Sequence, residues 1–136
     1  MKIKFLKTTD NSMKLRRLGA SIEYYFLKNK RVLVVVPSEA AGEYLDKFLW
    51  EQPKESFVPH CFSNDKLNEE VVITTENSNL NNAEILINLC PDRSPIADQF
   101  EFVFELWDET DQSRKELSEK RFNAYAAAGA EVELIP

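Results

Sequence analysis

The sequence is poor in the residues from which metal and redox sites are usually built. Its 136 residues include two cysteines, Cys61 and Cys90, and one histidine, His60. A structural zinc site takes four such ligands, and a redox centre usually takes two closely spaced cysteines, so neither kind of site is expected. We therefore predict that the protein uses no metal and no cofactor.

Glycine is equally scarce, with Gly19, Gly42 and Gly129 as its three occurrences. A nucleotide-binding α/β enzyme ordinarily has a glycine-rich loop after its first strand, because backbone without side chains can approach phosphate closely. The corresponding segment here, residues 8–13, has no glycine. Dinucleotide binding and nucleotide hydrolysis are therefore not expected.

Long apolar runs and an excess of positive charge are also missing. The longest apolar run, residues 32–37, is much shorter than the roughly 18 residues of a membrane span, so we expect a cytoplasmic protein. The net charge of -6 argues against a chain-wide surface for nucleic acid. The charge is unevenly spread, because residues 1–47 hold ten basic and five acidic groups and residues 48–136 hold seven and 18. The molecule is therefore expected to be electrically two-sided.

Strand-like and helix-like segments alternate along a chain whose length suits one domain, residues 1–136. Strands are expected at residues 3–7, 31–37, 71–75, 83–89, 100–106 and 131–135. Helices are expected at residues 13–29, from Ser38 to a break at Pro53, and at 112–128. This order predicts a single three-layer α/β domain, with a mostly parallel but mixed sheet between helices and a nucleotide-binding-like topology without a phosphate loop.

The last expected helix has two different stripes. The predicted core stripe consists of Leu117, Ala124 and Ala128. The second stripe consists of Lys115, Ser118, Phe122 and Ala126. A lysine and an aromatic ring on a shared outer face would suit the carboxylates and apolar side chains of a peptide. In the alternative interpretation, Lys115 pairs with Glu119 one turn later and Phe122 packs on the sheet.

Two further features leave alternatives open. Trp50 lies off the apolar stripe of its helix, so it is either a lid over the core or an exposed anchor for a partner, and Phe57 would extend the same patch. His60 and Cys61 are adjacent and could form a nucleophile pair. Adjacent residues of an extended segment point to different sides, however, and a packing or capping histidine is the simpler interpretation.

Several motifs resemble one known family. They are L-D-x-x-L-W at residues 45–50, S-F-x-P-H at 56–60, the apolar segment 84–89, and Arg121-Phe122-Asn123-Ala124-Tyr125. Together they resemble the chi subunit family of the bacterial DNA polymerase III holoenzyme over essentially the whole chain.

The resemblance implies a non-catalytic accessory subunit that takes part in DNA replication. In that family the subunit links the clamp loader, through the psi subunit, to the acidic, Phe-ended C-terminal tail of single-stranded DNA-binding protein. DNA is then reached only indirectly, and no membrane is involved. Trp50 and Phe57 match aromatic positions on the psi-facing side.

The resemblance also implies a set of residues for the tail. The tail-binding positions are Lys115, Phe122 and Tyr125, with Lys120 and Arg121 as nearby positive charge. The chain departs from the family at Glu119, where an arginine can occur, and at Asp108, where an apolar residue is usual. The tail-binding surface is then either weakened, or its charge is supplied by Lys14, Arg16 or Arg17 of the basic N-terminal third, if the fold brings them near.

Two other functions are considered from the residues themselves. The basic segment from Lys2 to Arg31 could bind single-stranded DNA directly, or His60 and Cys61 could serve a small α/β enzyme.

Overall fold

The computed structural model describes residues 1–52 and 58–136. The strands are β1 (Lys2–Thr8), β2 (Val32–Val35), β3 (Cys61–Phe62), β4 (Val71–Thr74), β5 (Ile85–Asn88), β6 (Phe102–Asp108) and β7 (Glu131–Ile135). The helices are α1 (Asn11–Leu27), α2 (Glu39–Trp50) and α3 (Gln112–Ala127), and a short 3-10 helix, η2, covers Ala97–Gln99. The expected strands and helices are all present, and the two-residue strand β3 is an addition to them.

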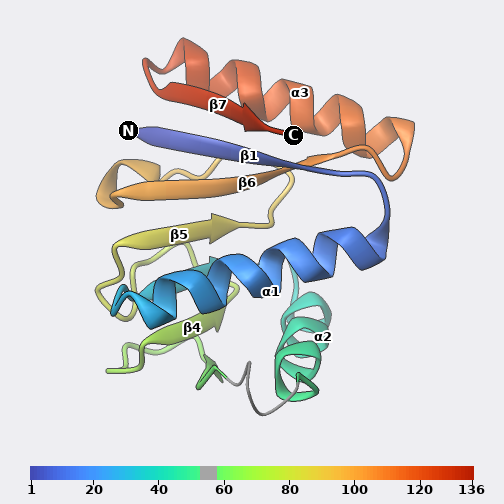
Figure 1. Cartoon of the computed structure of the whole chain (residues 1–136). Helices are drawn as coiled ribbons and strands as arrows, with labels where there is room; N and C mark the ends of the chain where they lie inside the picture. Colours follow the sequence, from blue (N-terminus) through green and yellow to red (C-terminus); the bar gives the residue numbers. More distant parts are fainter. Residues whose placement is uncertain (53–57) are drawn as a thin grey trace.

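The strands form one seven-stranded sheet in the order β3-β4-β2-β5-β6-β1-β7. Helices α1 and α2 lie on one face and α3 lies on the other (Figure 1), which confirms the expected three-layer α/β fold class. The expected mixture of strand directions is wrong for the described residues, because every pair there is parallel. The polar connections 63–70 and 75–84 contain no helix, yet each returns the chain to the opposite end of the sheet, as parallel pairing requires.

The inner strands β2, β4 and β5 are buried along their whole length, as continuous apolar runs predict for parallel strands covered on both faces. On one face, Leu18 and Ile22 of α1 and Leu45 and Leu49 of α2 fill the core. On the other face, Tyr125 of α3 is packed among the strand side chains. Among the described helices, none has the length and apolar character needed to cross a membrane.

The core-facing side of α3 differs from the expected one. The expected stripe contained Leu117, which is 37% exposed, and Ala128, which is exposed. The buried residues are instead Ser118, Arg121 and Tyr125. The apolar pattern misled the prediction because α3 is fixed to the sheet by hydrogen bonds from polar side chains, which a pattern of apolar residues cannot reveal.

The α-helices α1, α2 and α3 each begin at a polar side chain that caps the first turn. The Asp10 carboxylate accepts a hydrogen bond from the Met13 amide, the Ser38 hydroxyl from Ala41, and the Asp111 carboxylate from Arg114. Because a capping side chain satisfies an otherwise unpaired amide, these residues set the starts of the helices.

Gly42 of α2 and Gly19 of α1 provide a matched test of this packing. A Cβ at Gly42 would lie 2.6 Å from the Phe62 ring of β3, whereas a Cβ at Gly19 would meet the Phe48 ring at an ordinary 3.5 Å. We expect Gly42→Ala to lower the free energy of unfolding by about 1–3 kcal/mol through overpacking. Gly19→Ala should raise it by up to about 1 kcal/mol, because alanine favours the helix. Urea unfolding of both variants measures the difference, and equal effects would contradict the packing described here.

Candidate functional site

A buried carboxylate on β6 holds α3 against the sheet. Glu105 is 1% exposed, and its Oε1 accepts a hydrogen bond from Arg121 Nε at 3.0 Å. Its Oε2 accepts from the Tyr125 hydroxyl at 2.5 Å and from Asn88 Nδ2 at 2.7 Å. Three donors stabilise the ionised form of a buried carboxylate. The network therefore ties β5, β6 and α3 together.

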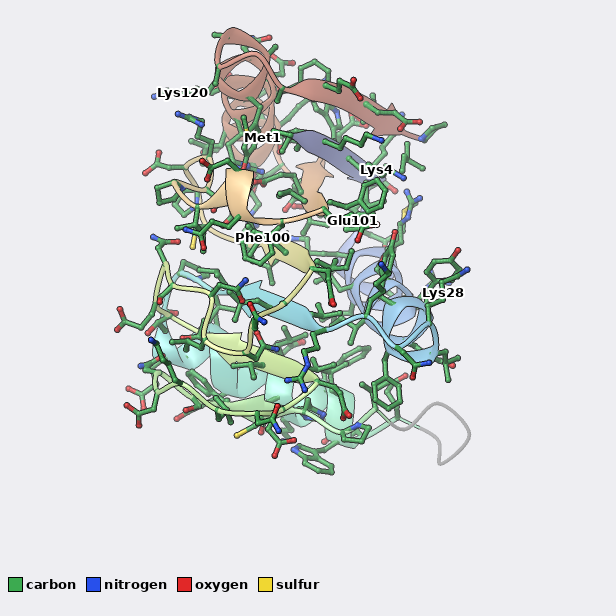
Figure 2. The ribbon with its side chains drawn as sticks, turned by 90° about the vertical axis from the view of Figure 1, so that its left-hand side faces the viewer. Met1, Lys4, Lys28, Phe100, Glu101 and Lys120 are labelled. Carbon is green, nitrogen blue, oxygen red and sulfur yellow. The ribbon has the colours of Figure 1, made fainter. Side chains whose placement is uncertain are left out.

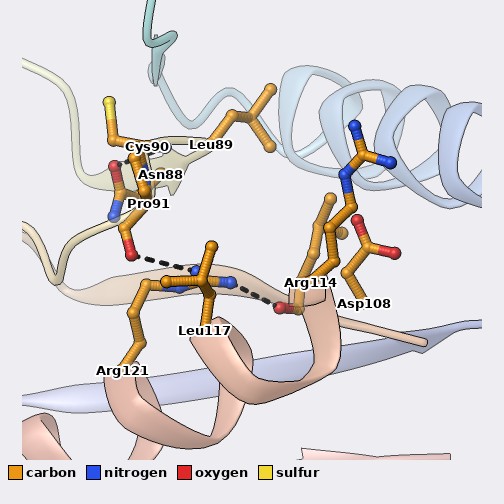
Figure 3. A pocket seen from close by; sticks show the side chains of 9 residues that line it. Asn88, Leu89, Cys90, Pro91, Asp108, Arg114, Leu117 and Arg121 are labelled. Atoms are coloured by element: carbon orange, nitrogen blue, oxygen red, sulfur yellow. Dashed lines mark hydrogen bonds between the residues drawn. The ribbon is translucent and has the colours of Figure 1, made fainter. Parts of the chain in front are cut away.

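Arg121 and Tyr125 have further partners in the interior. Arg121 donates to the carbonyl oxygens of Leu106, at 2.9 Å, and of Pro91, at 3.1 Å (Figure 3). The Ser94 amide donates to the Tyr125 hydroxyl at 2.8 Å. Both side chains point inward, with Arg121 8% and Tyr125 0% exposed. These two residues of the expected tail-binding set therefore fix the position of α3 and contribute little to its outer surface.

Burial and charge act in opposite directions on this network. Burial raises the pKa of Glu105 to about 7, while Arg121, Tyr125 and Asn88 favour its ionised form. Burial and the adjacent Glu105 carboxylate raise the pKa of Tyr125, so its hydroxyl keeps the proton that it donates. The attachment of α3 is thus sensitive to the protonation of one carboxyl group.

Beside this network, Phe122 of α3 packs on two aromatic side chains of the sheet. Its ring centroid lies 5.2 Å from that of Phe5 and 5.8 Å from that of Trp107. Phe5 is fully buried, whereas Phe122 and Trp107 remain half-buried. The alternative in which Phe122 packs on the sheet is confirmed, and the parts of Phe122 and Trp107 that stay accessible form an apolar surface.

Two lysines at this end of the sheet share one carboxylate. Glu109 lies 3.4 Å from Lys7 Nζ and 3.6 Å from Lys115 Nζ. The alternative pairing of Lys115 with Glu119 is therefore replaced by a pairing with Glu109, which follows the end of β6. Despite some desolvation, the ammonium of Lys7, the Trp107 indole and the ammonium of Lys115 hold the pKa of Glu109 below its usual value. Two ammonium groups around one carboxylate leave a local excess of positive charge.

We call Lys7, Trp107, Lys115 and Phe122 the aromatic–basic face. Sequence reasoning missed Lys7 and Trp107. The two are register partners on β1 and β6, and strand alternation places both on the α3 side of the sheet together with Phe5. That alternation is visible in the sequence, but the pairing of β1 with β6 is not. Lys120, which the prediction included, is an exposed residue of α3 (Figure 2).

The basic N-terminal third does reach the last helix. Lys14 Nζ lies 2.7 Å from Asp108 Oδ2, and Arg17 donates to the Lys7 carbonyl oxygen at 2.7 Å. Although burial opposes it, hydrogen bonds from Lys14 and Thr110 keep the pKa of Asp108 below its usual value. Lys7, Lys14 and Arg17 thus bring positive charge to the start of α3, while Asp108 neutralises part of it.

Other cations of the N-terminal third lie elsewhere. Lys28 closes α1 at the amino ends of the strands, where Lys4 also lies (Figure 2). Lys4 Nζ lies 4.6 Å from the centroid of the Phe102 ring, and Lys28 Nζ lies 4.9 Å from that of Tyr24. The positive charge of this third is therefore divided between the two ends of the sheet, which favours local contacts over one continuous track for single-stranded DNA.

Trp50 ends α2, far along the sheet from α3. Its side chain is 52% exposed, and its ring centroid lies 4.4 Å from that of His60. Trp50 is thus both a cover over His60 and an accessible aromatic surface, so the two interpretations of this residue are compatible. Phe57, the other aromatic residue expected on this surface, lies outside the described residues.

His60 and Cys61 do not show the contacts of a nucleophile pair. The His60 ring nitrogens lie near the carbonyl oxygens of Val58 and Asp46. The Cys61 thiol points toward the Phe62 carbonyl oxygen, and desolvation by burial raises its pKa, which disfavours the reactive thiolate.

Two adjoining hollows open at the carboxyl edge of the sheet. The smaller, of about 160 Å³, lies between Asn88, Cys90 and the first turns of α3 (Figure 3). The larger, of about 500 Å³, lies between α1 and α2, and the two share Leu89, Leu106, Asp108 and Arg114. Burial raises the pKa of the Cys90 thiol. Within the described residues, no group of three or more His, Cys, Asp or Glu side chains is placed to hold a metal ion.

The fold and the face together define an α/β protein whose candidate site is a surface suited to recognising another molecule. The chain belongs to the DNA polymerase III chi subunit family, because the family model described as DNA polymerase III chi subunit, HolC, matches residues 1–133. The chi subunit is an accessory subunit of that polymerase, which places the chain in DNA replication.

Two curated relatives agree with this assignment. The chain is 31% identical over 103 residues to DNA polymerase III subunit chi of Escherichia coli, across 74% of this chain and 69% of that protein. It is 28% identical over 85 residues to the probable DNA polymerase III subunit chi of Rickettsia prowazekii, across 61% of this chain and 52% of that protein. The match thus spans about half the length of the Rickettsia protein.

Arg121→Leu tests the network around Glu105. It removes the guanidinium that faces a buried carboxylate, so we expect the free energy of unfolding to fall by about 3–5 kcal/mol at neutral pH. Burial already raises the pKa of Glu105 from 4.5 to about 7, and it should rise further without the arginine. A carboxyl whose pKa is higher in the folded chain loses stability as the pH rises through that interval, so the deficit should be larger at about pH 8 than at about pH 5.

Urea unfolding at both pH values measures this deficit. The double variant Arg121→Leu with Glu105→Gln should lose the added pH dependence, because it has no buried carboxyl left to titrate. A deficit of equal size at both pH values would show that the arginine acts by packing alone.

Proposed function

We propose that this chain is a non-catalytic adaptor that links the clamp loader to the acidic C-terminal tail of single-stranded DNA-binding protein in the bacterial cytoplasm. The link to the clamp loader runs through a psi subunit or an equivalent component. Tail binding is supported by the aromatic–basic face, where two lysines border two accessible aromatic rings.

The chemistry of this face suits the proposed ligand. The Lys7 and Lys115 ammonium groups would bind carboxylates of the tail, in place of the Glu109 carboxylate that they now share. The accessible parts of Phe122 and Trp107 would contact the terminal phenylalanine ring, since aromatic pairs add binding energy beyond the area that they bury. Arg121 and Tyr125 would act as positioning residues, because they fix the helix that carries Phe122 and Lys115.

The exposed ring of Trp50 supports a second surface for the clamp-loader partner. Trp50 and the aromatic–basic face belong to opposite parts of the sheet, since α2 lies near β3 and β4 while α3 lies near β6 and β7. One chain could therefore hold both partners at once without a clash, which is what an adaptor requires.

A peptide titration tests the tail-binding face. Using an acidic peptide that ends in phenylalanine, we expect Lys115→Glu and Lys7→Glu each to weaken binding about tenfold or more, because each reverses a charge at the site. Glu109→Gln should strengthen binding severalfold, because it frees both lysines. Fluorescence anisotropy of the labelled peptide measures these changes.

Lys28→Glu is the matched control for this titration, because it changes the net charge equally at the amino end of the strands. A peptide without its final phenylalanine should bind at least about tenfold more weakly to the unchanged chain. Equal losses from Lys28→Glu and Lys115→Glu would show that only total charge matters, and would refute the proposed face.

A second prediction concerns Trp50. Trp50→Ala should abolish co-purification of the chain with its clamp-loader partner while leaving peptide affinity unchanged, because the ring is a large accessible aromatic at a separate surface. Tyr44→Ala is the matched control, since Tyr44 is a 64% exposed aromatic of the same helix. If the Tyr44 variant loses the partner and the Trp50 variant does not, the partner-binding surface lies elsewhere on α2 and the prediction for Trp50 is wrong.

A further inference from the structure

His60 occupies a site in which both ring nitrogens face oxygen acceptors. Nδ1 lies 2.8 Å from the Val58 carbonyl oxygen. Nε2 lies 3.1 Å from the Asp46 carbonyl oxygen and 3.2 Å from the Asp46 carboxylate. The side chain itself is 0% exposed, so water cannot replace these partners.

The number of protons on the ring follows from these partners. A neutral imidazole carries a proton on one nitrogen and a lone pair on the other. With either tautomer, one nitrogen lone pair would point at an oxygen lone pair, at 2.8 Å from Val58 or at 3.1 Å from Asp46. Only the imidazolium, which donates from both nitrogens, satisfies all of the contacts.

The surroundings of the ring also favour a positive charge. The Asp46 carboxylate is its counter-ion, and its Nε2 meets a carbonyl oxygen in the C-terminal half of α2, where the helix dipole favours cations. The Trp50 ring lies against it with a centroid separation of 4.4 Å, within the range of a cation–π contact. Burial opposes the charge by desolvation.

We propose that His60 is a doubly protonated positioning residue that fixes the Trp50 surface and makes it responsive to pH. The imidazolium connects Val58, which precedes β3, to Asp46 of α2, and the Trp50 ring rests on it. Loss of one proton breaks one of the two backbone contacts and removes the cation under Trp50. The part of this inference that concerns partner binding rests on the proposed role of Trp50, whereas the protonation does not.

The described charged groups near the ring are few. Asp46 is in direct contact, and Cys61 follows His60 in the chain, with Glu69 close enough to act on the Cys61 thiol. On the outer side of α2, Lys47 and Glu51 face each other at 4.0 Å and are largely exposed. Asp46 is therefore the described group whose charge most directly decides the protonation of His60.

The chain has one histidine, so NMR of its imidazole reports His60 without ambiguity. In the full chain at about pH 7, we expect both ring nitrogens to carry protons. Asp46→Asn, which keeps an oxygen acceptor but removes the charge, should leave one ring nitrogen without a proton under the same conditions, because the imidazolium loses its counter-ion. A ring nitrogen without a proton at about pH 7 would overturn the proposal.

Tryptophan fluorescence tests the link to Trp50. In a Trp107→Phe background, the emission of Trp50 should change with pH at the same midpoint as the His60 ring, and His60→Gln should make it flat over that range. A Trp50 signal that ignores the ring titration would overturn the positioning role, even if the ring is doubly protonated. The peptide titration above is independent of this result, so failure here leaves the tail-binding proposal standing.

Binding of the clamp-loader partner gives the last measurement. Its affinity should fall severalfold as the pH rises through the ring midpoint, and His60→Gln should not show that fall. If the Trp50 variant abolishes binding but the affinity does not follow the ring titration, the partner surface is upheld and its control by His60 is refuted.

Discussion

The attachment of α3 depends on a single buried carboxylate. Glu105 receives hydrogen bonds from Arg121, Tyr125 and Asn88, and Arg121 in turn reaches backbone carbonyls of β6 and of the loop after β5. The hydrophobic core alone would let an amphipathic helix slide or rotate, since apolar contact has little directionality. Charge-assisted hydrogen bonds between fixed partners remove that freedom. Phe122 and Lys115 therefore keep a defined position beside Trp107 and Lys7.

The parallel sheet brings together residues that are far apart in the sequence. In a parallel α/β sheet the carboxyl ends of the strands and the amino ends of the following helices meet at one edge. Here that edge receives Lys7 from β1, Glu109 from the segment after β6 and Lys115 from α3. The basic N-terminal third of an acidic chain thus supplies charge to its last helix. The overall charge of -6 says little about this local site.

The elements were predictable because each has a clear local signal. Short apolar runs marked β2 and β5, and the helices begin at Asp or Ser caps. The buried face of α3 was not predictable, because Ser118, Arg121 and Tyr125 are buried by hydrogen bonds that exist only once β5 and β6 are in place. Lys7 and Trp107 were missed for a similar reason: their proximity depends on the β1–β6 register. Caps and apolar runs can be recognised in the sequence, whereas contacts between residues of distant strands depend on how the strands pair in the folded sheet.

Glu109 gives the aromatic–basic face a further property. Its carboxylate is tethered beside Lys7 and Lys115, so it acts as an intramolecular competitor at high effective concentration. A ligand with a lone carboxylate merely exchanges one anion for another and gains little. A ligand that offers several carboxylates together with an aromatic end gains contacts that Glu109 cannot reproduce. Glu109 therefore makes the face selective: it disfavours the binding of single anions and leaves the binding of a ligand with several carboxylates and an aromatic end favourable.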